Sequence, residues 1–531
     1  MNEVRNQEQN EAHNASMGGT VGQMMINTII RHAERPCLAD DNTHWSYAEY
    51  GDTIARYIAV YKQAGLKRGE GLSILAGNRV EVMAASVAAI IMGLRYTPLH
   101  PLASEDDHTF IIEDAEITAL ICDPTSFGER AVRIAQTVKT VRTLFSFGPL
   151  ENAHDLLADA KTVTPAPLKD EADADTIAYI AYTGGTTGRP KGVVHKPRGL
   201  ITAILHMISD WDWPDDIRFL ACTPISHAAG ATSWPVLIRG GFTRLAPGFN
   251  PKRFFELIET EKLNTSFMVP TMIYVLLDDP ELKHRDLSSL QTIIYGAAPM
   301  SPERMIEAIG VFGNVFVQLY GQTEAPNVIT TLRKIDHDIN KPARLGSCGL
   351  PSLFVDVEVF DSDMKPVGIG EPGEICVRGP IVMVGYWKRP EETAEALKGG
   401  WLHTGDVAVR DADGYLTIVD RAKDMIISGG FNIYPREVED ALLAHPAIAS
   451  AAVIGVPDAK WGEAVKAFVA LKPGAQVKTA ELQAHVKARR GALWAPKSVE
   501  FMEAIPVTGL GKVDRKALRK AYWSEDGRQV S

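Results

Sequence analysis

The sequence is poor in cysteine, in long apolar runs and in positive charge, and each shortage excludes a class of protein. Its 531 residues include five scattered cysteines without a Cys-x-x-Cys pair, which indicates reduced thiols rather than a disulfide framework or a zinc site. The longest apolar run, 82–94, is shorter than the ~18 residues of a membrane-spanning segment. Asp and Glu outnumber Lys and Arg by 66 to 55, a net charge of −11. We therefore expect no nucleic acid partner and no integral membrane association.

Several catalytic signatures are also missing. The chain has no H-E-x-x-H and no G-x-S-x-G, which removes support for a zinc protease or a hydrolase with a nucleophile elbow. Residues 368–373 match G-x-G-x-x-G, but Pro372 lies inside the match and a strand-like run follows, so we predict a β-turn rather than an NAD site. Residues 1–20 are polar and lack the apolar run of a signal peptide. They predict a disordered tail on a cytoplasmic protein.

The first two thirds of the chain alternate between strand-like and helix-like stretches. Short apolar runs at 71–77 and 118–123 flank a helix-like stretch at 82–92, the order typical of a parallel sheet covered by helices. Residues 176–341 repeat this alternation, with 251–261 as one of the intervening helices. Two α/β halves are expected.

The pattern changes beyond residue 342. The runs 354–361, 373–379 and 414–420 predict the strands of a half-exposed β unit, and from 421 the chain becomes compact, α+β and basic toward its end. A single core stops growing near ~250–300 residues, so several units are required. We predict an α/β fold: a large N-terminal domain (21–420) of two α/β subdomains plus a β subdomain, and a small α+β C-terminal domain (421–531).

The densest chemical signal is the segment Tyr182-Thr-Gly-Gly-Thr-Thr-Gly-Arg-Pro-Lys-Gly192. Its glycines allow close backbone approach, its threonines offer hydroxyl donors and Lys191 adds positive charge, which together suit a phosphate cradle. Arg189 and Pro190 break the register of a Walker A loop. The alternative is a Gly- and Thr-rich surface loop without a ligand.

This segment resembles the AMP-binding signature of the acyl-adenylate-forming superfamily, which includes acyl-CoA synthetases, aryl-CoA ligases such as 4-chlorobenzoate-CoA ligase and 4-coumarate-CoA ligase, peptide-synthetase adenylation domains and firefly luciferase. The resemblance covers residues 25–520, because six further motifs follow in the order of that superfamily. They are Tyr295-Gly-Ala-Ala-Pro299, Tyr320-Gly-Gln-Thr-Glu324, Thr404-Gly-Asp406, Asp420-Arg-Ala-Lys-Asp424, Gly429-Gly-Phe-Asn432 and Pro506-Val-Thr-Gly-Leu-Gly-Lys512.

The resemblance implies an ATP site. Glu324 would help bind Mg²⁺, Thr323 would hydrogen-bond the α-phosphate, and Asp406 would accept both ribose hydroxyls. Lys512 would stabilise charge at the α-phosphate, so that Lys512, Thr323 and Glu324 form the catalytic set. The alternative for Lys512 is a solvated lysine in a basic tail. The implied ATP-binding residues are Thr183, Gly184, Gly185, Thr186, Thr187, Lys191, Gly296, Ala297, Ala298, Tyr320, Gly321, Thr323, Asp406, Arg421 and Lys512.

The C-terminal motifs are similar to those of free-standing CoA ligases. Lys423 would be the hinge about which the C-terminal domain swings after adenylation. The implied CoA-binding residues are Gly429, Gly430, Phe431, Trp461 and Lys497, with the glycines lining the pantetheine tunnel and Trp461 stacking on the CoA adenine. A packed surface tryptophan is the alternative for Trp461. Ala495 replaces a usual basic residue, for which Lys487, Arg489 or Arg490 would have to compensate.

The implied acid pocket consists of His227, Tyr274, Tyr295, Gly296, Gly321 and Ala325. His227 would gate it, and a hydrogen-bonded interior histidine is the alternative. The surrounding stretches contain no charged residue except Glu324, so an apolar acid is favoured, either aromatic or medium-chain.

The sequence favours an AMP-forming carboxylic acid–CoA ligase that uses ATP, Mg²⁺ and CoA. The first alternative is an adenylate-forming enzyme that transfers the acyl group to an amine or a carrier-protein thiol. The second is a nucleotide-binding regulatory protein without catalysis, against which the intact Lys512, Glu324 and Lys191 argue. A homodimer is compatible with the sequence.

Overall fold

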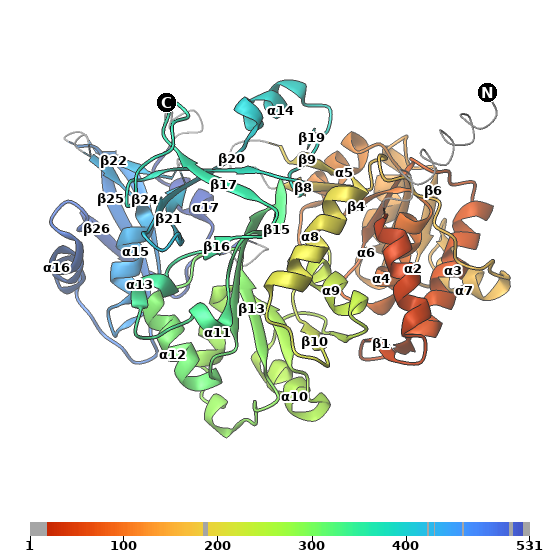
Figure 1. The fold of residues 1–531 in the computed structure, drawn as a ribbon, viewed down its shortest axis with the longest axis horizontal. Coiled ribbons are helices and arrows are strands. Elements are labelled where there is room, and N and C mark those ends of the chain that lie inside the picture. Colours follow the sequence, from red (N-terminus) through yellow and green to blue (C-terminus); the bar gives the residue numbers. More distant parts are fainter. Residues whose placement is uncertain are drawn as a thin grey trace, which may run out of the picture.

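The computed structural model (Figure 1) describes residues 19–183, 189–421, 424–428, 431–458, 461–508 and 513–523, apart from the side chains of residues 420, 421 and 432. The tail predicted at 1–20 lies outside this description except for its last two residues. In Figure 1 the chain passes from one α/β body at the right, through a second in the centre, to the C-terminal strands and helices at the left.

The first body is built on an eight-stranded sheet of order β19-β9-β8-β4-β3-β5-β6-β7. Its strands are β3 (Gly71–Leu75), β4 (Arg95–Pro98), β5 (Ile117–Cys122), β6 (Thr143–Ser146), β7 (His154–Asp155), β8 (Tyr179–Thr183), β9 (Lys191–His195) and β19 (Gly385–Tyr386). Its helices are α3 (Tyr47–Gln63), α4 (Val80–Ile91), α5 (Glu105–Asp114), α6 (Pro124–Thr137) and α7 (Leu156–Thr162). Strands β3 to β8 pair in parallel, whereas β9 and β19 are antiparallel.

Both faces of this sheet are covered, which explains why its strands are almost continuously apolar. On β5, Ile121 belongs to the core shared with α3 and α4, while Leu120 belongs to a separate core with α5 and α6. Successive strand residues point to opposite faces, so a strand buried on both sides needs apolar residues at every position.

The second body is built on a nine-stranded sheet of order β16-β15-β14-β13-β12-β10-β11-β1-β2. Its strands are β1 (Pro36–Ala39), β2 (His44–Ser46), β10 (Arg218–Ala221), β11 (Phe242–Leu245), β12 (Thr265–Met268), β13 (Thr292–Gly296), β14 (Phe316–Gln322), β15 (Ala325–Leu332) and β16 (Leu350–Pro351). The helical segments are α2 (Val21–Arg31), α8 (Pro197–Asp210), α9 (Ala228–Ile238), α10 (Pro251–Glu261), α11 (Pro270–Leu277), α12 (Pro302–Phe312), α13 (Pro342–Leu345), η1 (Leu282–His284) and η2 (Lys334–Asp336). The neighbouring strands β12, β13 and β14 are parallel, so their carboxyl ends meet at one edge.

Two further units complete the chain. A four-stranded sheet contains β17 (Asp356–Phe360), β18 (Gly373–Arg378), β20 (Leu402–Arg410) and β21 (Leu416–Arg421), with α14 (Pro390–Ala396) and η3 (Lys398–Gly400) nearby in the chain. The C-terminal part contains β22 (Ile426–Ser428), β23 (Phe431–Ile433), β24 (Ile448–Asp458), β25 (Gly462–Leu471), β26 (Ser498–Phe501), α15 (Pro435–Leu443), α16 (Thr479–Arg490) and α17 (Arg515–Arg519).

The predicted α/β fold class is confirmed, and so are the elements on which it was based. The apolar run 71–77 contains β3, and the run 118–123 overlaps β5 at all but its first residue. The stretch 82–92 lies on α4 and its C-cap, and 251–261 is α10. The predicted turn at 368–373 is present, because the Glu371 amide donates to the Gly368 carbonyl at 3.1 Å and Gly370 has a φ of 77°. Strand β18 follows it directly, as expected for a turn rather than a dinucleotide loop.

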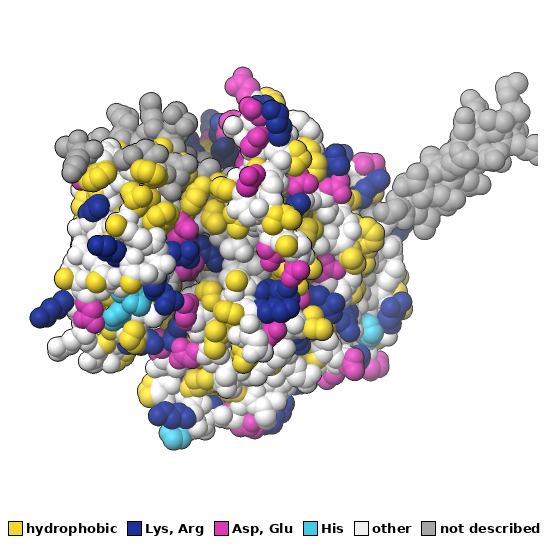
Figure 2. All heavy atoms as spheres, turned by 60° about the vertical axis from the view of Figure 1, so that its left-hand side comes forward, with side chains coloured by type: hydrophobic (Ala, Val, Ile, Leu, Met, Phe, Trp, Pro, Cys, Tyr) yellow, Lys and Arg dark blue, Asp and Glu magenta, His cyan; other side chains and the backbone are white. Residues whose placement is uncertain are grey.

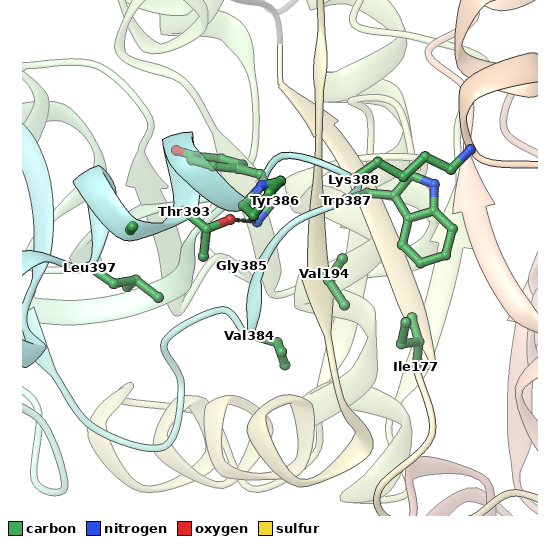
Figure 3. Close-up of a pocket in the computed structure, with 11 residues that line it drawn as sticks. Ile177, Val194, Val384, Gly385, Tyr386, Trp387, Lys388, Thr393 and Leu397 are labelled. Atoms are coloured by element: carbon green, nitrogen blue, oxygen red, sulfur yellow. Dashed lines mark hydrogen bonds between the residues drawn. The ribbon is translucent and has the colours of Figure 1, made fainter.

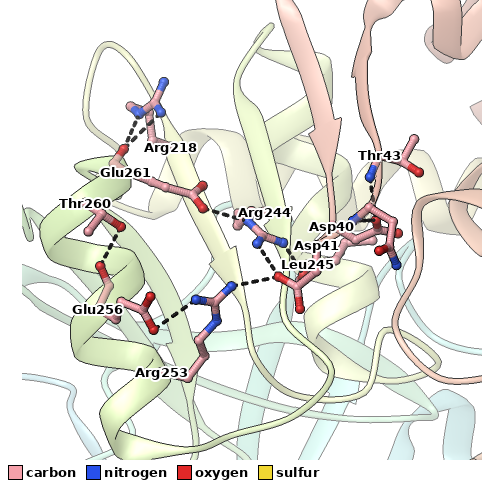
Figure 4. Close-up of polar contacts among 11 residues, drawn as sticks. Asp40, Asp41, Thr43, Arg218, Arg244, Leu245, Arg253, Glu256, Thr260 and Glu261 are labelled. Carbon is pink, nitrogen blue, oxygen red and sulfur yellow. Dashed lines mark hydrogen bonds and ion pairs between the residues drawn. The ribbon is translucent and has the colours of Figure 1, made fainter.

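A buried ionic joint ties β11 to α10 and to the loop after β1 (Figure 4). Arg244 is 4% exposed, contacts Asp41 and lies 2.9 Å from Glu261. Arg253 on α10 donates to the same Asp41 at 2.8 Å. These two guanidinium groups hold the pKa of the Asp41 carboxyl below its usual range. Removal of one partner from such a pair leaves an uncompensated buried charge, so the joint fixes the relative positions of these segments.

The C-terminal part contacts the rest of the chain through α15 and α16. Arg436 is 8% exposed and donates to the carbonyls of Ile418 and Gly346 at 2.8 and 3.2 Å. Arg489 pairs with Glu303 at 3.0 Å. Figure 2, turned toward this part, shows cationic and acidic side chains interspersed over the visible face. Among the described helices, none has both the length and the apolar character needed to cross a membrane.

Candidate active site

The predicted phosphate loop joins the antiparallel strands β8 and β9. Thr183 pairs with Lys191 across the two strands, so both ends of the loop are fixed by the sheet. The Lys191 ammonium contacts Glu392 on α14 and lies 5.0 Å from the centre of the Tyr386 ring. Gly184, Gly185, Thr186 and Thr187 lie outside the described residues. The structure therefore positions the two ends of the predicted cradle and its cation.

The turn between β14 and β15 carries Thr323 and Glu324. The Glu324 carboxylate accepts a hydrogen bond from the Tyr386 hydroxyl at 2.8 Å, and the Glu324 carbonyl accepts from the Met383 amide at 2.8 Å. His195, at the end of β9, lies with Nε2 2.7 Å from the Thr323 carbonyl. Because a carbonyl can only accept, Nε2 carries the proton. Burial lowers the pKa of His195 to about 4, so the ring is a neutral donor at pH 7.

Asp406 on β20 lies beside the same turn and is 4% exposed. Its carboxylate accepts from the Tyr320 hydroxyl at 2.7 Å and from Gln322 Nε2 at 2.6 Å. Gln322 also donates to the Thr404 carbonyl at 2.8 Å. Burial and the nearby carboxylate raise the pKa of Tyr320 well above its ordinary value, so its hydroxyl stays a donor. Two donors thus orient the carboxylate that the sequence assigns to ribose.

Gly296 and Gly321 allow close packing of the strand ends around this site. A Cβ on Gly296 would lie 2.4 Å from the Leu319 carbonyl oxygen, and a Cβ on Gly321 would lie 2.4 Å from the Asn327 amide nitrogen. Ala297 follows Gly296 with a φ of 63°. Both glycines are therefore required by contacts within the protein, in addition to any approach of a nucleotide. Ala298 follows directly, beyond the end of β13.

The predicted acid-pocket residues lie at the ends of neighbouring elements. His227 caps the start of α9, with Nδ1 2.9 Å from the Ser226 hydroxyl, and its ring meets the edge of His100 at a centroid distance of 4.6 Å. The Tyr274 hydroxyl accepts from the Ser301 amide at 2.9 Å. Ala325, at the start of β15, is buried.

Tyr295 donates its hydroxyl to His337 Nε2 at 3.0 Å, since His337 Nδ1 faces the Arg333 carbonyl at 2.8 Å and must carry the proton. The hydroxyls of Tyr274 and Tyr295 are therefore both engaged by protein groups. Tyr295 is 1% exposed, so its ring is buried within the protein, whereas the Tyr274 hydroxyl keeps its own proton to donate.

Two of the predicted CoA residues come together in the C-terminal part. Lys497 Nζ lies 5.4 Å from the centre of the Trp461 ring, where Trp461 directly precedes β25 and Lys497 directly precedes β26. Phe431 on β23 is 57% exposed. Arg489 and Arg490, the suggested substitutes for a basic residue at Ala495, pair instead with Glu303 at 3.0 Å and Glu437 at 3.7 Å.

Several predicted positions cannot be placed. Lys423, Gly429, Gly430 and Lys512 lie outside the described residues, as does the side chain of Arg421. The flanks of the Lys512 segment are described, and Val507 and Val513 form an antiparallel bridge there.

Comparison with known proteins assigns this chain to a family. The AMP-binding enzyme family matches residues 27–387, and the AMP-binding enzyme C-terminal domain matches residues 437–512. The chain belongs to the AMP-binding enzyme family. This bears out the resemblance to adenylate-forming enzymes drawn from the sequence motifs.

Three relatives of this AMP-binding enzyme are informative. A medium/long-chain-fatty-acid–CoA ligase of Mycobacterium tuberculosis is 44% identical over 523 residues, covering 96% of this chain and 91% of the relative. A feruloyl-CoA synthase of Amycolatopsis is 36% identical over 497 residues, covering 93% and 96%. Among solved structures, the amide bond synthetase McbA of Marinactinospora thermotolerans superposes with a TM-score of 0.87 at 33% identity, covering 94% of this chain and 99% of that one.

In this AMP-binding enzyme, three residues that orient the site were not predicted from the sequence. His195 ends an apolar strand and gives the pattern of an ordinary core residue. Gln322 lies inside a recognised motif, but nothing local indicates that it reaches Asp406. Tyr386 lies 62 residues from its partner Glu324. Each acts on a residue that is distant in sequence, so no spacing pattern could have revealed it.

A surface cavity of about 450 Å³ opens next to this site (Figure 3). Its lining is chiefly apolar and includes Ile177, Val194, Val384, Tyr386, Thr393 and Leu397. It shares Tyr386 with the Glu324 pair, but its lining contains none of the residues predicted for the acid pocket. We therefore treat it as a neighbour of the predicted ATP site rather than as the predicted acid pocket.

Proposed function

We propose that this enzyme is an ATP-dependent, AMP-forming carboxylic acid–CoA ligase. The observation that carries the proposal is the buried Asp406 carboxylate, oriented by Tyr320 and Gln322 beside the Thr323–Glu324 turn. A two-oxygen acceptor suits a pair of vicinal hydroxyls, and the adjacent turn supplies a hydroxyl and a carboxylate for phosphates and their cation. The CoA ligase names of two relatives support the same reaction.

The proposed reaction has two steps. The substrate carboxylate attacks the ATP α-phosphorus, pyrophosphate leaves, and an acyl-AMP forms. The CoA thiolate then attacks the acyl carbon, and AMP leaves. Thr323 would bind the α-phosphate, Lys191 the outer phosphates and Lys512 the charge that develops during adenylation. No protein nucleophile is needed, so positioning and electrostatics supply the catalysis.

Glu324 is the residue proposed to hold Mg²⁺. A carboxylate oxygen is the hard ligand that Mg²⁺ prefers, and the hydrogen bond from Tyr386 at 2.8 Å fixes the orientation of that carboxylate. When bound, Mg²⁺ would neutralise phosphate charge. Tyr386 would then act by positioning Glu324.

The acid proposed as substrate is apolar, either aromatic or medium-chain. The Tyr295 hydroxyl supports this, because it donates its proton to His337 and does not offer it to a polar substrate. The two ligases reported above take a fatty acid and a ferulate, respectively, according to their names. A charged or amino acid substrate would find no partner in the predicted stretches apart from Glu324.

A second acceptor class is supported by one specific observation. The amide bond synthetase shares 33% identity and the same fold over 99% of its chain, so an amine is the alternative to CoA. The pairing of Lys497 with Trp461 favours CoA, because an aromatic ring and a cation suit its adenine and phosphates. A cytoplasmic location and a homodimer remain predictions. Light scattering of the purified protein measures its molar mass and so tests the homodimer.

The deciding experiment measures AMP and pyrophosphate release from ATP and Mg²⁺ with a panel of aromatic, medium-chain and long-chain acids. Each acid is tested with CoA, with an amine and without an acceptor. The proposal expects turnover that requires CoA together with one acid class. Pyrophosphate release that CoA leaves unchanged and an amine accelerates would contradict the ligase and support the alternative.

Trp461→Ala should raise the KM for CoA and leave the KM for ATP unchanged.

A further inference from the structure

Three metal-ligating side chains converge on one face of the four-stranded sheet. Glu374 and Cys376 are two residues apart on β18 and therefore share a face. Cys376 pairs directly with His403 on β20, so all three side chains lie on that face. One ligand atom from each lies within 4.8 Å of the other two.

The distances suit a divalent metal with mixed ligands. His403 Nδ1 lies 3.6 Å from Cys376 Sγ and 2.8 Å from Glu374 Oε2. In tetrahedral zinc sites the metal lies about 2.3 Å from sulfur and about 2.0–2.1 Å from nitrogen, which separates the two ligands by roughly 3.6 Å. The shorter nitrogen-to-oxygen distance is that of an ion pair or hydrogen bond, which a metal would replace.

The backbone already orients two of these ligands. The Gly405 amide donates to the other carboxylate oxygen of Glu374 at 2.8 Å, and His403 Nε2 lies 3.3 Å from the Lys398 carbonyl. A donor bond from the far ring nitrogen to a carbonyl leaves Nδ1 directed at the cluster, which is the usual outer arrangement of a metal-binding histidine. The bulge that brings Gly405 to Glu374 lies in β20 between His403 and Val407.

Burial and charge are also compatible with a metal. Cys376 is fully buried, whereas the side chains of His403 and Glu374 are 20% and 30% exposed, so solvent reaches one side of the cluster. The carboxylate of Glu358, which lies opposite Cys376 on β17, is paired with Arg410 at 2.9 Å. A divalent cation bound by one thiolate, one carboxylate and a neutral imidazole gives a site of zero net charge.

We propose that Glu374, Cys376 and His403 form a binding site for a divalent transition metal of the zinc type, with water as the fourth ligand. Binding would displace the thiol proton and the proton between His403 and Glu374 to solvent. The metal would join β18 to β20 immediately before the Thr404–Asp406 segment. No motif in the sequence predicts this site, because Cys376 and His403 lie 27 residues apart in the chain.

The test is a titration of the metal-free, full-length protein with Co²⁺ in the absence of nucleotide. We expect saturation at one ion per chain and a thiolate-to-cobalt charge-transfer band in the near ultraviolet. Cys376→Ser should abolish that band. Cys222→Ser is the matched control, because Cys222 is also buried and its sulfur lies 3.8 Å from the Ser266 hydroxyl, and it should retain the band.

His403→Asn provides a second variant that keeps the sulfur and changes a partly exposed residue. It should weaken Co²⁺ binding by about tenfold or more. Circular dichroism establishes that each variant is folded. Lack of saturable binding by the wild-type protein, or a charge-transfer band that survives in Cys376→Ser, would overturn the proposal and leave an ion pair packed on a buried thiol.

Discussion

Gln322 shows how one side chain can control a site without being predicted to touch the substrate. Its amide bonds both the Asp406 carboxylate and the Thr404 carbonyl, at 2.6 and 2.8 Å. Removal of this amide leaves the buried carboxylate with one donor fewer and frees it to rotate. The consequence should appear in ATP binding rather than in acid binding.

We therefore expect Gln322→Ala to raise the KM for ATP by about tenfold, in line with the loss of a hydrogen bond to a charged group. The KM for the acid should stay within twofold or so of the wild-type value, because Gln322 holds the ribose acceptor. Steady-state kinetics of AMP formation give both constants. The exposed Gln291→Ala serves as a control. An unchanged KM for ATP would show that the orientation of Asp406 does not matter.

Two buried histidines make the free energy of unfolding depend on pH, and their lowered pKa values set the direction of that dependence. Burial lowers the pKa of His195 and of His337 to about 4, from 6.5. Below pH 6.5 these two histidines become protonated in the unfolded chain, whereas in the folded chain they stay neutral until about pH 4. The free energy of unfolding should therefore fall as the pH drops through this window, by about 1.4 kcal/mol per pH unit for each histidine.

Urea denaturation at several pH values between about 7 and 5 measures this slope. His337→Gln should make the slope shallower by the contribution of one proton, whereas the exposed His284→Gln should leave it unchanged. Identical slopes for His337→Gln and wild type would mean that His337 titrates normally in the folded protein.

At the scale of elements, the close packing of helix α9 against the preceding segment depends on glycine at position 230. A Cβ on Gly230 would lie 1.8 Å from the Ile225 carbonyl oxygen, which is far closer than any real contact. The same close packing places His227 at the start of the helix, next to His100. A change at Gly230 should therefore disturb both the fold and the predicted acid pocket.

Gly230→Ala should lower the free energy of unfolding by roughly 3 kcal/mol, since backbone has to move to relieve the overlap. The matched control is Gly310→Ala on α12, where an added Cβ would meet nothing within 4 Å. That substitution should leave the stability unchanged or raise it by up to about 1 kcal/mol. Chemical denaturation compares the two, and equal stability of both variants would contradict the packing argument.

At the scale of the whole molecule, polar contacts of α15 and α16 join the C-terminal part to the rest of the described chain. Arg436 binds two backbone carbonyls across the boundary, and Arg489 pairs with Glu303. The Arg489–Glu303 pair is exposed, and exposed ion pairs contribute about 0–1 kcal/mol, so this pair offers little resistance to a change of orientation. This is compatible with the proposed alternation, in which Lys512 serves adenylation and then gives way to the CoA residues.

Lys512→Ala should abolish acyl-AMP formation and still permit thioester formation from supplied acyl-AMP and CoA, because the two steps would use different orientations. The control is Lys516→Ala, an exposed lysine on α17. Pyrophosphate release measures the first step and thioester formation the second. Equal loss of both steps would argue against two orientations.

The sequence alone determined the α/β class, the principal strands and helices and the family, because these depend on local features. Apolar periodicity encodes the elements β5 and α10, and the glycine- and threonine-rich run that predicts a phosphate loop is itself a local feature. The tail, the hinge and most of the predicted loop residues lie outside the described part of the chain, so those predictions stay open.

Tertiary structure alone decided which side chains hold the site in place. Tyr320 and Asp406 are 86 residues apart, and His195 and Thr323 are 128 residues apart. Such pairs depend on strand order and register, which arise from the packing of whole sheets and leave no periodic trace in the sequence. The same holds for Glu374, Cys376 and His403, whose convergence follows from the register of β18 against β20.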